Sequence, residues 1–98
     1  MPGRGGMWPY VYGHPVIDFP DINPRGERHP YRQIADVIAA AIDRGELRPG
    51  EPVPSEKDIQ DMTGVGRSTV RRAVAYLRDE GIIYTVPGRG SYVAERDG

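Results

Sequence analysis

The 98-residue sequence contains no cysteine, and its two histidines, His14 and His29, lie in a stretch rich in proline and glycine. Disulfides and thiolate metal sites are therefore excluded, and we expect neither a metal nor a cofactor. No apolar run approaches the roughly 20 residues that a membrane-spanning helix needs, and the N-terminus lacks the apolar segment of a secretory signal. We expect a cytoplasmic protein without a membrane partner, stabilised by its own packing or by a partner chain.

The sequence also lacks the residue groupings of an enzyme. In residues 31–94 no cysteine or histidine accompanies a nucleophile, and no carboxylate cluster has a recognisable catalytic spacing. The formal net charge is only −1, which by itself argues against a nucleic-acid binder. However, residues 31–64 hold four basic and seven acidic residues, whereas residues 65–90 hold five arginines and two acidic residues. A local electrostatic footprint for DNA is therefore compatible with the net acidity.

The N-terminal part differs in composition from the rest of the chain. Residues 1–30 contain six of the ten prolines together with several glycines, so regular structure is not expected over most of them. Trp8, Tyr10, Tyr12 and Phe19 nevertheless make this part more apolar than a typical disordered tail. We call residues 1–29 the N-terminal arm. Residues 7–19 are our candidate surface for a homodimer, and a disordered tail is the alternative.

The spacing of apolar residues predicts a first helix over about residues 31–44. Ile34, Ile38 and Ile42 recur at the helical interval, and Gly45 follows as a stop signal. After a turn, residues 51–54 are too rich in proline for more than a short edge strand.

A second, shorter helix has a clear start. Ser55 and Asp58 have the spacing of a capping box, which predicts that the helix begins at Glu56. Ile59 and Met62 are expected to face inward.

A glycine turn at residues 64–66 separates this helix from a third one, which is predicted over about residues 67–80 and is stopped by Gly81. Val65, inside the turn, is expected to face the core. Two short helices joined by a three-residue turn that contains glycine are typical of a helix-turn-helix.

The C-terminal part is predicted to be a β-hairpin, with strands at residues 82–86 and 91–94 and a turn at 87–90. A hairpin directly after a helix-turn-helix is a wing. We therefore expect an α+β fold: a winged helix-turn-helix with three helices plus a C-terminal β-hairpin wing. The expected organisation is the arm at residues 1–29, a DNA-binding domain at 30–94 and a tail at 95–98.

The third helix has one apolar and one basic face when it is wound at about 100° per residue. Its predicted buried stripe consists of Val70, Ala73, Val74 and Leu77. Its outward face holds Ser68, Arg71, Arg72 and Ala75, flanked by Arg67 and Arg78 on one side and by Thr69 and Tyr76 on the other. Arginines can pair with guanine edges or bind phosphates, and short side chains let a helix sit deeply in the major groove. The alternative is a solvated helix face that happens to be basic.

Two further places are candidates for DNA contact. Lys57 lies in the first turn of the second helix, where the helix dipole disfavours a cation but favours a phosphate; an ordinary solvated lysine is the alternative. Gly88 and Gly90 permit unusual backbone conformations and close approach, and Arg89 between them is suited to a narrow minor groove or to phosphates. We call residues 88–90 the wing tip; a plain hairpin turn with an exposed arginine is the alternative.

The sequence resembles the N-terminal DNA-binding domain of the GntR family of bacterial regulators over roughly residues 30–93. The matching stretches are Tyr31-Arg-Gln-Ile-Ala35, Ile42-Asp-Arg-Gly-Glu-Leu-Arg-Pro-Gly50, Val53-Pro-Ser-Glu-Lys57, Gly64-Val-Gly-Arg-Ser-Thr-Val-Arg71, Leu77-Arg-Asp-Glu-Gly81 and Gly88-Arg-Gly90. The resemblance implies that operator DNA is contacted by Lys57, Arg67, Ser68, Thr69 and Arg71, with the wing tip in or near the minor groove.

Three residues depart from the family pattern. Lys57 stands where arginine is usual, so that a forked phosphate contact becomes a point-charge contact. Gly66 replaces a common serine or threonine and removes a helix cap, and Arg72 replaces a common acidic residue. The chain also ends eight residues after Gly90, so neither the family's effector-binding domain nor a small-molecule effector is expected.

The leading interpretation is a sequence-specific, DNA-binding transcriptional regulator that acts as a repressor at a double-stranded DNA operator. The alternative is a winged-helix adaptor that binds proteins. The net acidity and the aromatic arm would be compatible with such an adaptor. Symmetric operators usually require two-fold protein symmetry, which favours a homodimer.

Overall fold

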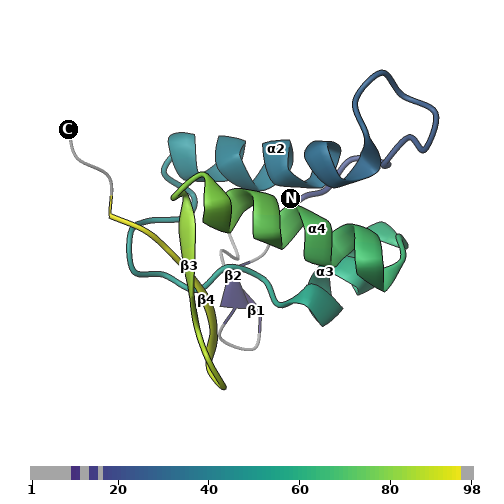
Figure 1. Cartoon of the computed structure of the whole chain (residues 1–98). Coiled ribbons are helices and arrows are strands. Elements are labelled where there is room, and N and C mark those ends of the chain that lie inside the picture. Colours follow the sequence, from purple (N-terminus) through teal and green to yellow (C-terminus); the bar gives the residue numbers. More distant parts are fainter. Residues whose placement is uncertain (1–9, 12–13, 16, 96–98) are drawn as a thin grey trace.

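The computed structural model describes residues 10–11, 14–15 and 17–95 of the chain. In chain order its elements are β1 (Tyr10–Val11), β2 (His14–Pro15), α2 (Pro30–Asp43), α3 (Glu56–Thr63), α4 (Arg67–Asp79), β3 (Ile83–Val86) and β4 (Gly90–Val93). Three helices followed by an antiparallel hairpin confirm the predicted winged helix-turn-helix (Figure 1). Of the predicted homodimer surface at residues 7–19, residues 7–9, 12–13 and 16 lie outside the described part, as do residues 96–98 of the tail.

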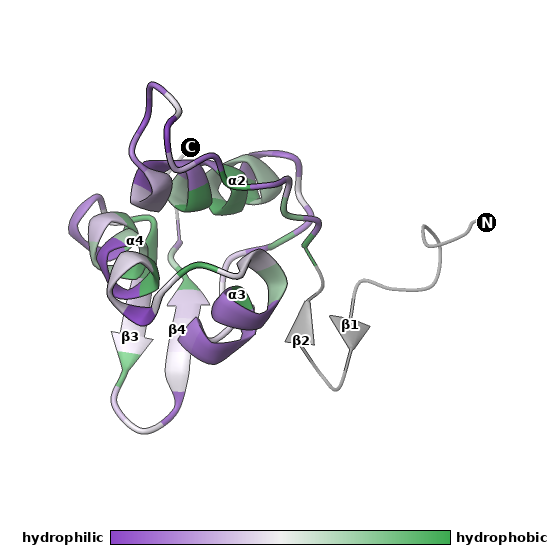
Figure 2. Cartoon of the chain, turned by 90° about the vertical axis from the view of Figure 1, so that its right-hand side faces the viewer, coloured by the Kyte–Doolittle hydropathy of each residue, from purple (hydrophilic) through white to green (hydrophobic). Residues whose placement is uncertain are grey.

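The hydrophobic core lies where the three helices meet the inner face of the hairpin. The buried residues that form it are Ile17, Ile34, Ala35, Ile38, Ala41, Ile42, Leu47, Val53, Ile59, Val70, Ala73, Val74, Leu77, Ile83 and Val93. Figure 2 shows hydrophilic residues along the outer sides of α3 and α4. Every helix thus contributes one apolar face to the core, which is why the apolar spacing in the sequence predicted their orientation.

The core also includes a residue of the N-terminal arm. Ile17 is only 4% exposed, and Phe19 and Ile22 pack against the same cluster. Part of the segment that was expected to form a homodimer surface therefore packs on the chain's own domain. The two short strands of the arm, β1 and β2, pair antiparallel, Tyr10 with Pro15 and Val11 with His14.

Helix α2 has proline at its first position, and a side chain of this helix holds the preceding loop in place. Pro30 lacks the N–H that would be unsatisfied there, and the carbonyl of His29 accepts from the backbone of Arg32 and Gln33. The Gln33 side chain donates to the carbonyls of Asn23 (2.7 Å) and Arg28 (2.8 Å) and accepts from the Asn23 N–H (2.9 Å). One glutamine thus fixes the loop at residues 23–28 against α2.

Helix α3 starts as predicted but differs at its last turn. The hydroxyl of Ser55 accepts from the Asp58 N–H (3.0 Å), and the Asp58 carboxylate accepts from the Ser55 N–H (3.4 Å), which is the predicted capping box. Ile59 is fully buried, but the prediction that Met62 faces inward is wrong, since this side chain is 39% exposed. Met62 lies in the last turn of an eight-residue helix, and this turn extends past the core.

The glycine turn works as expected. Gly64 ends α3 in the left-handed conformation with φ of 75°, and its N–H donates to the Gln60 carbonyl (2.7 Å). Val65 packs half-buried against the core, as predicted. The turn thereby directs α4 across both α2 and α3 (Figure 1).

The hairpin pairs Ile83 with Val93 and Thr85 with Ser91. Residues 51–53 run along the outer side of β4, where the Val53 N–H donates to the Ser91 carbonyl and the Glu51 carbonyl accepts from the Val93 N–H. This single bridge stays within the short edge strand that is the most the proline-rich segment was expected to form.

The predicted helix and strand boundaries differ from the observed ones by no more than one residue. Arg44 and Glu80, predicted as the last helical residues, are C-caps in the structure. In the described part of the chain, none of the helices has the length and apolar character needed to cross a membrane.

Candidate DNA-binding surface

The exposed face of α4 carries the arginines that the sequence predicts there. Val70, Ala73, Val74 and Leu77 are buried, which confirms the predicted stripe. Arg67, Ser68, Arg71 and Arg72 are exposed, whereas Thr69 is half-buried. A cationic surface with a serine near its centre therefore stands free of the core, and its width is that of a single helix.

No carboxylate neutralises these arginines within the described part of the chain. The ion pairs found there join Arg28 to Asp36, Arg44 to Glu46 and Lys57 to Asp61. The pKa of Glu46 is lowered because its carboxylate accepts hydrogen bonds from the Arg44 side chain, but this exposed pair follows the C-terminal end of α2. Within the described residues, the α4 arginines are therefore not engaged in any of these ion pairs.

The N-terminus of α4 adds backbone donors to this surface. Gly66 occupies the N-cap position and makes no side-chain cap, and the first turn contains no acidic residue. The first N–H groups of a helix have no partner inside the helix and carry the positive end of its dipole. Because Gly66 stands where the family commonly has serine or threonine, backbone N–H donors of the first turn remain available next to Arg67 and Ser68.

Lys57 lies on the neighbouring helix α3, but its position is less favourable than the sequence suggested. Its Nζ is 3.2 Å from the Asp61 carboxylate, and the first turn of α3 also contains Glu56 and Asp58. The capping box already satisfies donors at this helix start. The lysine side chain is 83% exposed, so the ion pair is weak and a phosphate can compete for the cation.

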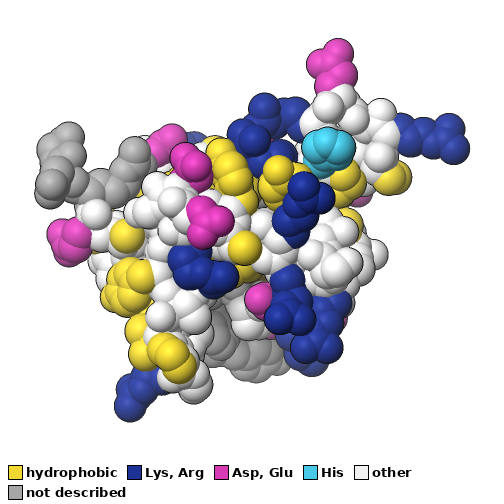
Figure 3. Space-filling view, viewed as in Figure 1, with side chains coloured by type: hydrophobic (Ala, Val, Ile, Leu, Met, Phe, Trp, Pro, Cys, Tyr) yellow, Lys and Arg dark blue, Asp and Glu magenta, His cyan; other side chains and the backbone are white. Residues whose placement is uncertain are grey.

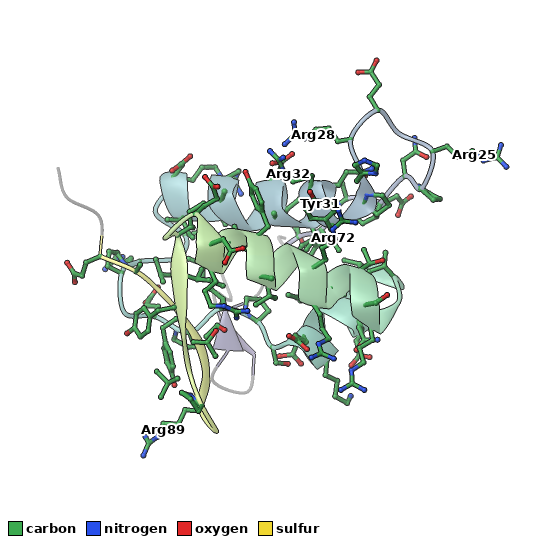
Figure 4. The ribbon with its side chains drawn as sticks, in the orientation of Figure 1. Arg25, Arg28, Tyr31, Arg32, Arg72 and Arg89 are labelled. Carbon is green, nitrogen blue, oxygen red and sulfur yellow. The ribbon has the colours of Figure 1, made fainter. Side chains whose placement is uncertain are left out.

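The wing tip combines left-handed backbone with an exposed arginine. Gly88 has φ of 78° and Gly90 has φ of 121°, conformations that side chains other than glycine rarely adopt. A Cβ at either position would meet nothing within 4 Å, so it is the backbone conformation and not crowding within the chain that requires glycine. Arg89 projects from the end of the hairpin, away from the helices (Figure 4).

A hydrogen-bond chain connects α4 to the wing. Arg78 Nη1 donates to Thr85 Oγ1 (3.0 Å), and this hydroxyl is 2.8 Å from Ser91 Oγ. Sequence reasoning placed Arg78 at the edge of the basic face but missed Thr85 and Ser91. The alternation of side chains in a strand could have identified Thr85, since it shares the helix-facing side of β3 with Ile83.

Arg72 is exposed but turned toward α2. Its guanidinium carbon lies 4.2 Å from the ring centre of Tyr31, while that of Arg32 lies 4.3 Å from the ring centre of Tyr76. The two tyrosine rings meet edge to face at 6.2 Å. Sequence reasoning assigned these residues to separate helices and missed the cluster, because no local pattern pairs residue 31 with residue 72.

The basic side chains form groups on one face of the molecule. Figure 3 shows Lys and Arg over the loop before α2, at the boundary between α2 and α4, below the first turns of α4, and at the tip of the hairpin. Figure 3 also shows Asp and Glu side chains and a further basic group near the C-terminal end of α4. The basic groups at the first turns of α4 and at the hairpin tip are therefore visible from one side of the molecule.

Comparison with known proteins agrees with this arrangement. Residues 30–93 match the model of the family described as bacterial regulatory proteins, gntR family. The mannosyl-D-glycerate transport/metabolism system repressor MngR of Escherichia coli is 46% identical over 70 residues, which are 71% of this chain and 29% of that protein. The chain spans less than a third of the length of the first curated relatives that it matches.

Solved structures share both the fold and part of the sequence. YtrA of Sulfolobus acidocaldarius, a GntR-family transcription factor, superposes with a TM-score of 0.71 at 39% identity, covering 79% of this chain and 81% of that one. The DNA-binding domain of AraR, solved in complex with operator ORX1, gives a TM-score of 0.64 at 34% identity over 65% of this chain and 77% of that one. Because the family model covers well over half of the sequence, this chain belongs to the gntR family of bacterial regulatory proteins.

Proposed function

We propose that this chain is a sequence-specific DNA-binding transcriptional regulator that inserts α4 into the major groove of a double-stranded operator. The observation that carries the proposal is the exposed face of α4, where Arg67 and Arg71 have no carboxylate partner among the described residues and lie beside the small residue Ser68. The major groove, about 12 Å wide, admits one helix. The proposal implies a cytoplasmic location, where bacterial operators lie.

The roles of the site residues follow from their positions. Arg67 and Arg71 are proposed to read base edges, since a guanidinium can donate two hydrogen bonds to guanine. Ser68 and Thr69 are proposed to bind near the start of the helix, where unpaired backbone donors favour a phosphate. Lys57 is proposed to bind a phosphate beside the helix, and Arg72 is proposed as a further DNA contact.

The wing tip is proposed to approach the minor groove or its phosphates. Gly88 and Gly90 allow the backbone to approach DNA without a Cβ, and Arg89 supplies a cation that a narrow minor groove attracts. The hydrogen bond from Arg78 to Thr85 supports this role because it fixes the hairpin relative to α4.

Repression by occupying a promoter is the proposed mode of regulation. MngR, a relative that is similar over 71% of this chain, is named a repressor. A homodimer on a two-fold symmetric operator is proposed, with half-sites about one or more helical turns apart. The predicted dimer surface at residues 7–19 of the arm stays the candidate, although Ile17 within it is buried in the chain's own core.

The test is the selection of bound duplexes from a random DNA pool with the full 98-residue chain. Enrichment of a defined sequence, bound with an affinity that falls steeply as salt rises, would support the proposal. An inverted repeat in that sequence would further indicate a dimer. A pool that remains random, together with a stable protein complex in pull-downs, would reject DNA binding in favour of the adaptor alternative.

A further inference from the structure

The cluster of Tyr31, Arg32, Arg72 and Tyr76 lies on the side of α4 that faces α2, and we call it the tyrosine–arginine cluster. Its two arginines each lie over a tyrosine ring, and Figure 4 shows Tyr31 and Arg72 next to each other between the two helices. His29 stacks on Tyr31 with 6.1 Å between ring centres. The cluster is thus an ordered group of cations and rings outside the α4 face that is proposed to read bases.

We infer that the tyrosine–arginine cluster is a second phosphate-binding surface, which contacts the DNA backbone on the side of the major groove opposite to Lys57. This inference rests on the proposed function. A helix in the major groove is flanked by both sugar–phosphate backbones. A protein that neutralises phosphates on only one side leaves the other backbone's charge uncompensated.

The geometry of α4 supports a two-sided contact. At about 100° per residue, Arg71 and Arg72 lie about 100° apart around the helix axis, with Ser68 between them. Arg71 is therefore on the side of Arg67 and the wing-directed Arg78. Arg72 is on the side of α2, because it lies over the ring of Tyr31. If Ser68 faces the floor of the groove, the two arginines face opposite walls.

The stacking leaves the guanidinium groups able to bind phosphate. A tyrosine ring contacts the flat face of a guanidinium, while the N–H donors lie in the plane of the group and remain directed outward. The ring limits the rotamers of the long side chain, so less conformational entropy is lost when the phosphate binds. Arg72 is exposed, which makes it the principal ligand of the cluster.

The local charge of the cluster is positive. Asp36 lies one helical turn after Arg32, but its carboxylate is paired with Arg28 through two oxygens and not with Arg32. Arg32 Nε is buried without a hydrogen-bond partner in the described structure. Residues 25–36 and Arg72 together hold four arginines and two carboxylates, so the surface has cations in excess.

The loop before α2 keeps this charge in place. The three hydrogen bonds of the Gln33 side chain fix the backbone of Asn23 and Arg28. Arg25 extends from the same loop into solvent (Figure 4). A phosphate backbone that runs past Arg72 and Arg32 would therefore meet further positive charge beyond them.

The experiment measures how affinity for the selected duplex depends on salt, using wild type, Arg72→Ala, Arg72→Lys and the control Arg48→Ala. Arg48 is exposed in the turn after α2, at the opposite end of that helix from the cluster. Arg72→Ala is expected to weaken binding on the order of tenfold at low salt and to lower the salt slope by about 1, equally for all DNA sequences. Arg72→Lys should retain the slope, and Arg48→Ala should match wild type.

Neutral methylphosphonate linkages, introduced one at a time in each strand, then locate the contact. In wild type, neutralising a phosphate on the α2 side should weaken binding, and the same change should have no effect on Arg72→Ala. Phosphates whose neutralisation weakens binding by wild type but not binding by Lys57→Ala should lie on the other side of the groove. Arg32→Gln, which removes the positive charge but keeps a polar side chain, should show a smaller effect at a neighbouring phosphate.

The outcomes separate the inference from the proposed function. If Arg71→Ala weakens binding but Arg72→Ala leaves both the slope and the phosphate map unchanged, the cluster only joins α2 to α4 and the inference is overturned. A lower thermal midpoint without any change in slope leads to the same conclusion. If wild type shows no salt-dependent binding to any duplex, the proposed function fails and the inference fails with it.

Discussion

Arg78 on α4 donates a 3.0 Å hydrogen bond to Thr85 on the wing, and the Thr85 hydroxyl also meets Ser91 on the opposite strand. This contact adds a polar link between α4 and the hairpin, whose Ile83 and Val93 are also buried in the core. We infer that the orientation of the wing tip relative to α4 depends in part on this exposed hydroxyl. A tilt at the base of the hairpin would displace Arg89 from the groove that it is proposed to approach.

Thr85→Val tests this connection. Valine has the same shape and suits a strand, so the hairpin should fold, but the hydrogen bond from Arg78 is lost. We expect a loss of about 0.5–1.5 kcal/mol in the free energy of unfolding and weaker DNA binding without a change in base preference. Thr85→Ser, which keeps the hydroxyl, is the control in denaturant unfolding and in titrations with the selected duplex. Equal binding by Thr85→Val and wild type would show that the bond does not orient the wing.

The capping box of α3 gives a prediction about stability alone. Ser55→Ala removes the hydroxyl that accepts from the Asp58 N–H, and loss of such a cap costs about 1 kcal/mol. Urea unfolding monitored by circular dichroism measures the change. Ser55→Thr retains an acceptor and should lose much less. If both variants were as stable as wild type, the capping box would not contribute to folding.

The two glycines of the turn should respond differently to substitution. Gly64 has a positive φ, so Gly64→Ala forces a side chain into the left-handed region and should cost roughly 1–2 kcal/mol. Gly66 has φ of −71°, and no atom lies within 4 Å of an added Cβ. Gly66→Ser should therefore be tolerated and stabilise α4 by a few tenths of a kcal/mol through its N-cap. Similar losses for both variants in thermal unfolding would contradict this assignment.

Packing of the arm on the domain predicts that residue 17 contributes to stability. Ile17 is 4% exposed within the core, so Ile17→Ala should destabilise the chain by about 2–5 kcal/mol, whereas Ile17→Val should cost only about 0.5–1.5 kcal/mol. Denaturant midpoints for the two variants give this comparison. A negligible effect of Ile17→Ala would mean that the arm does not form part of the folded core.

Local chemistry made most of the fold predictable from the sequence. The capping box at Ser55, the left-handed Gly64 and the apolar stripe from Val70 to Leu77 all act within a few residues of one another. Their structures therefore follow from short patterns. Met62 was assigned wrongly because the helical spacing gives a direction but does not tell whether the core extends that far.

The contacts that were missed join residues far apart in the chain. Tyr31 meets Arg72 only because α2 and α4 pack together, and Ile17 reaches the core only because of the path of the arm. Neither contact leaves a local pattern in the sequence. The exposed arginines of α4 were predictable for the opposite reason, since one helix determines their positions by itself.

The most direct test of the central claim is the affinity of Arg67→Ala and Arg71→Ala for the duplex that the wild-type chain selects, with Arg48→Ala as the control. Because both arginines are exposed on α4 and have no carboxylate partner in the part of the chain that the structure describes, each substitution should weaken binding by about 1–3 kcal/mol and relax the preference for particular bases, while the control binds like wild type. Wild-type affinity and base preference in both α4 variants would contradict the account.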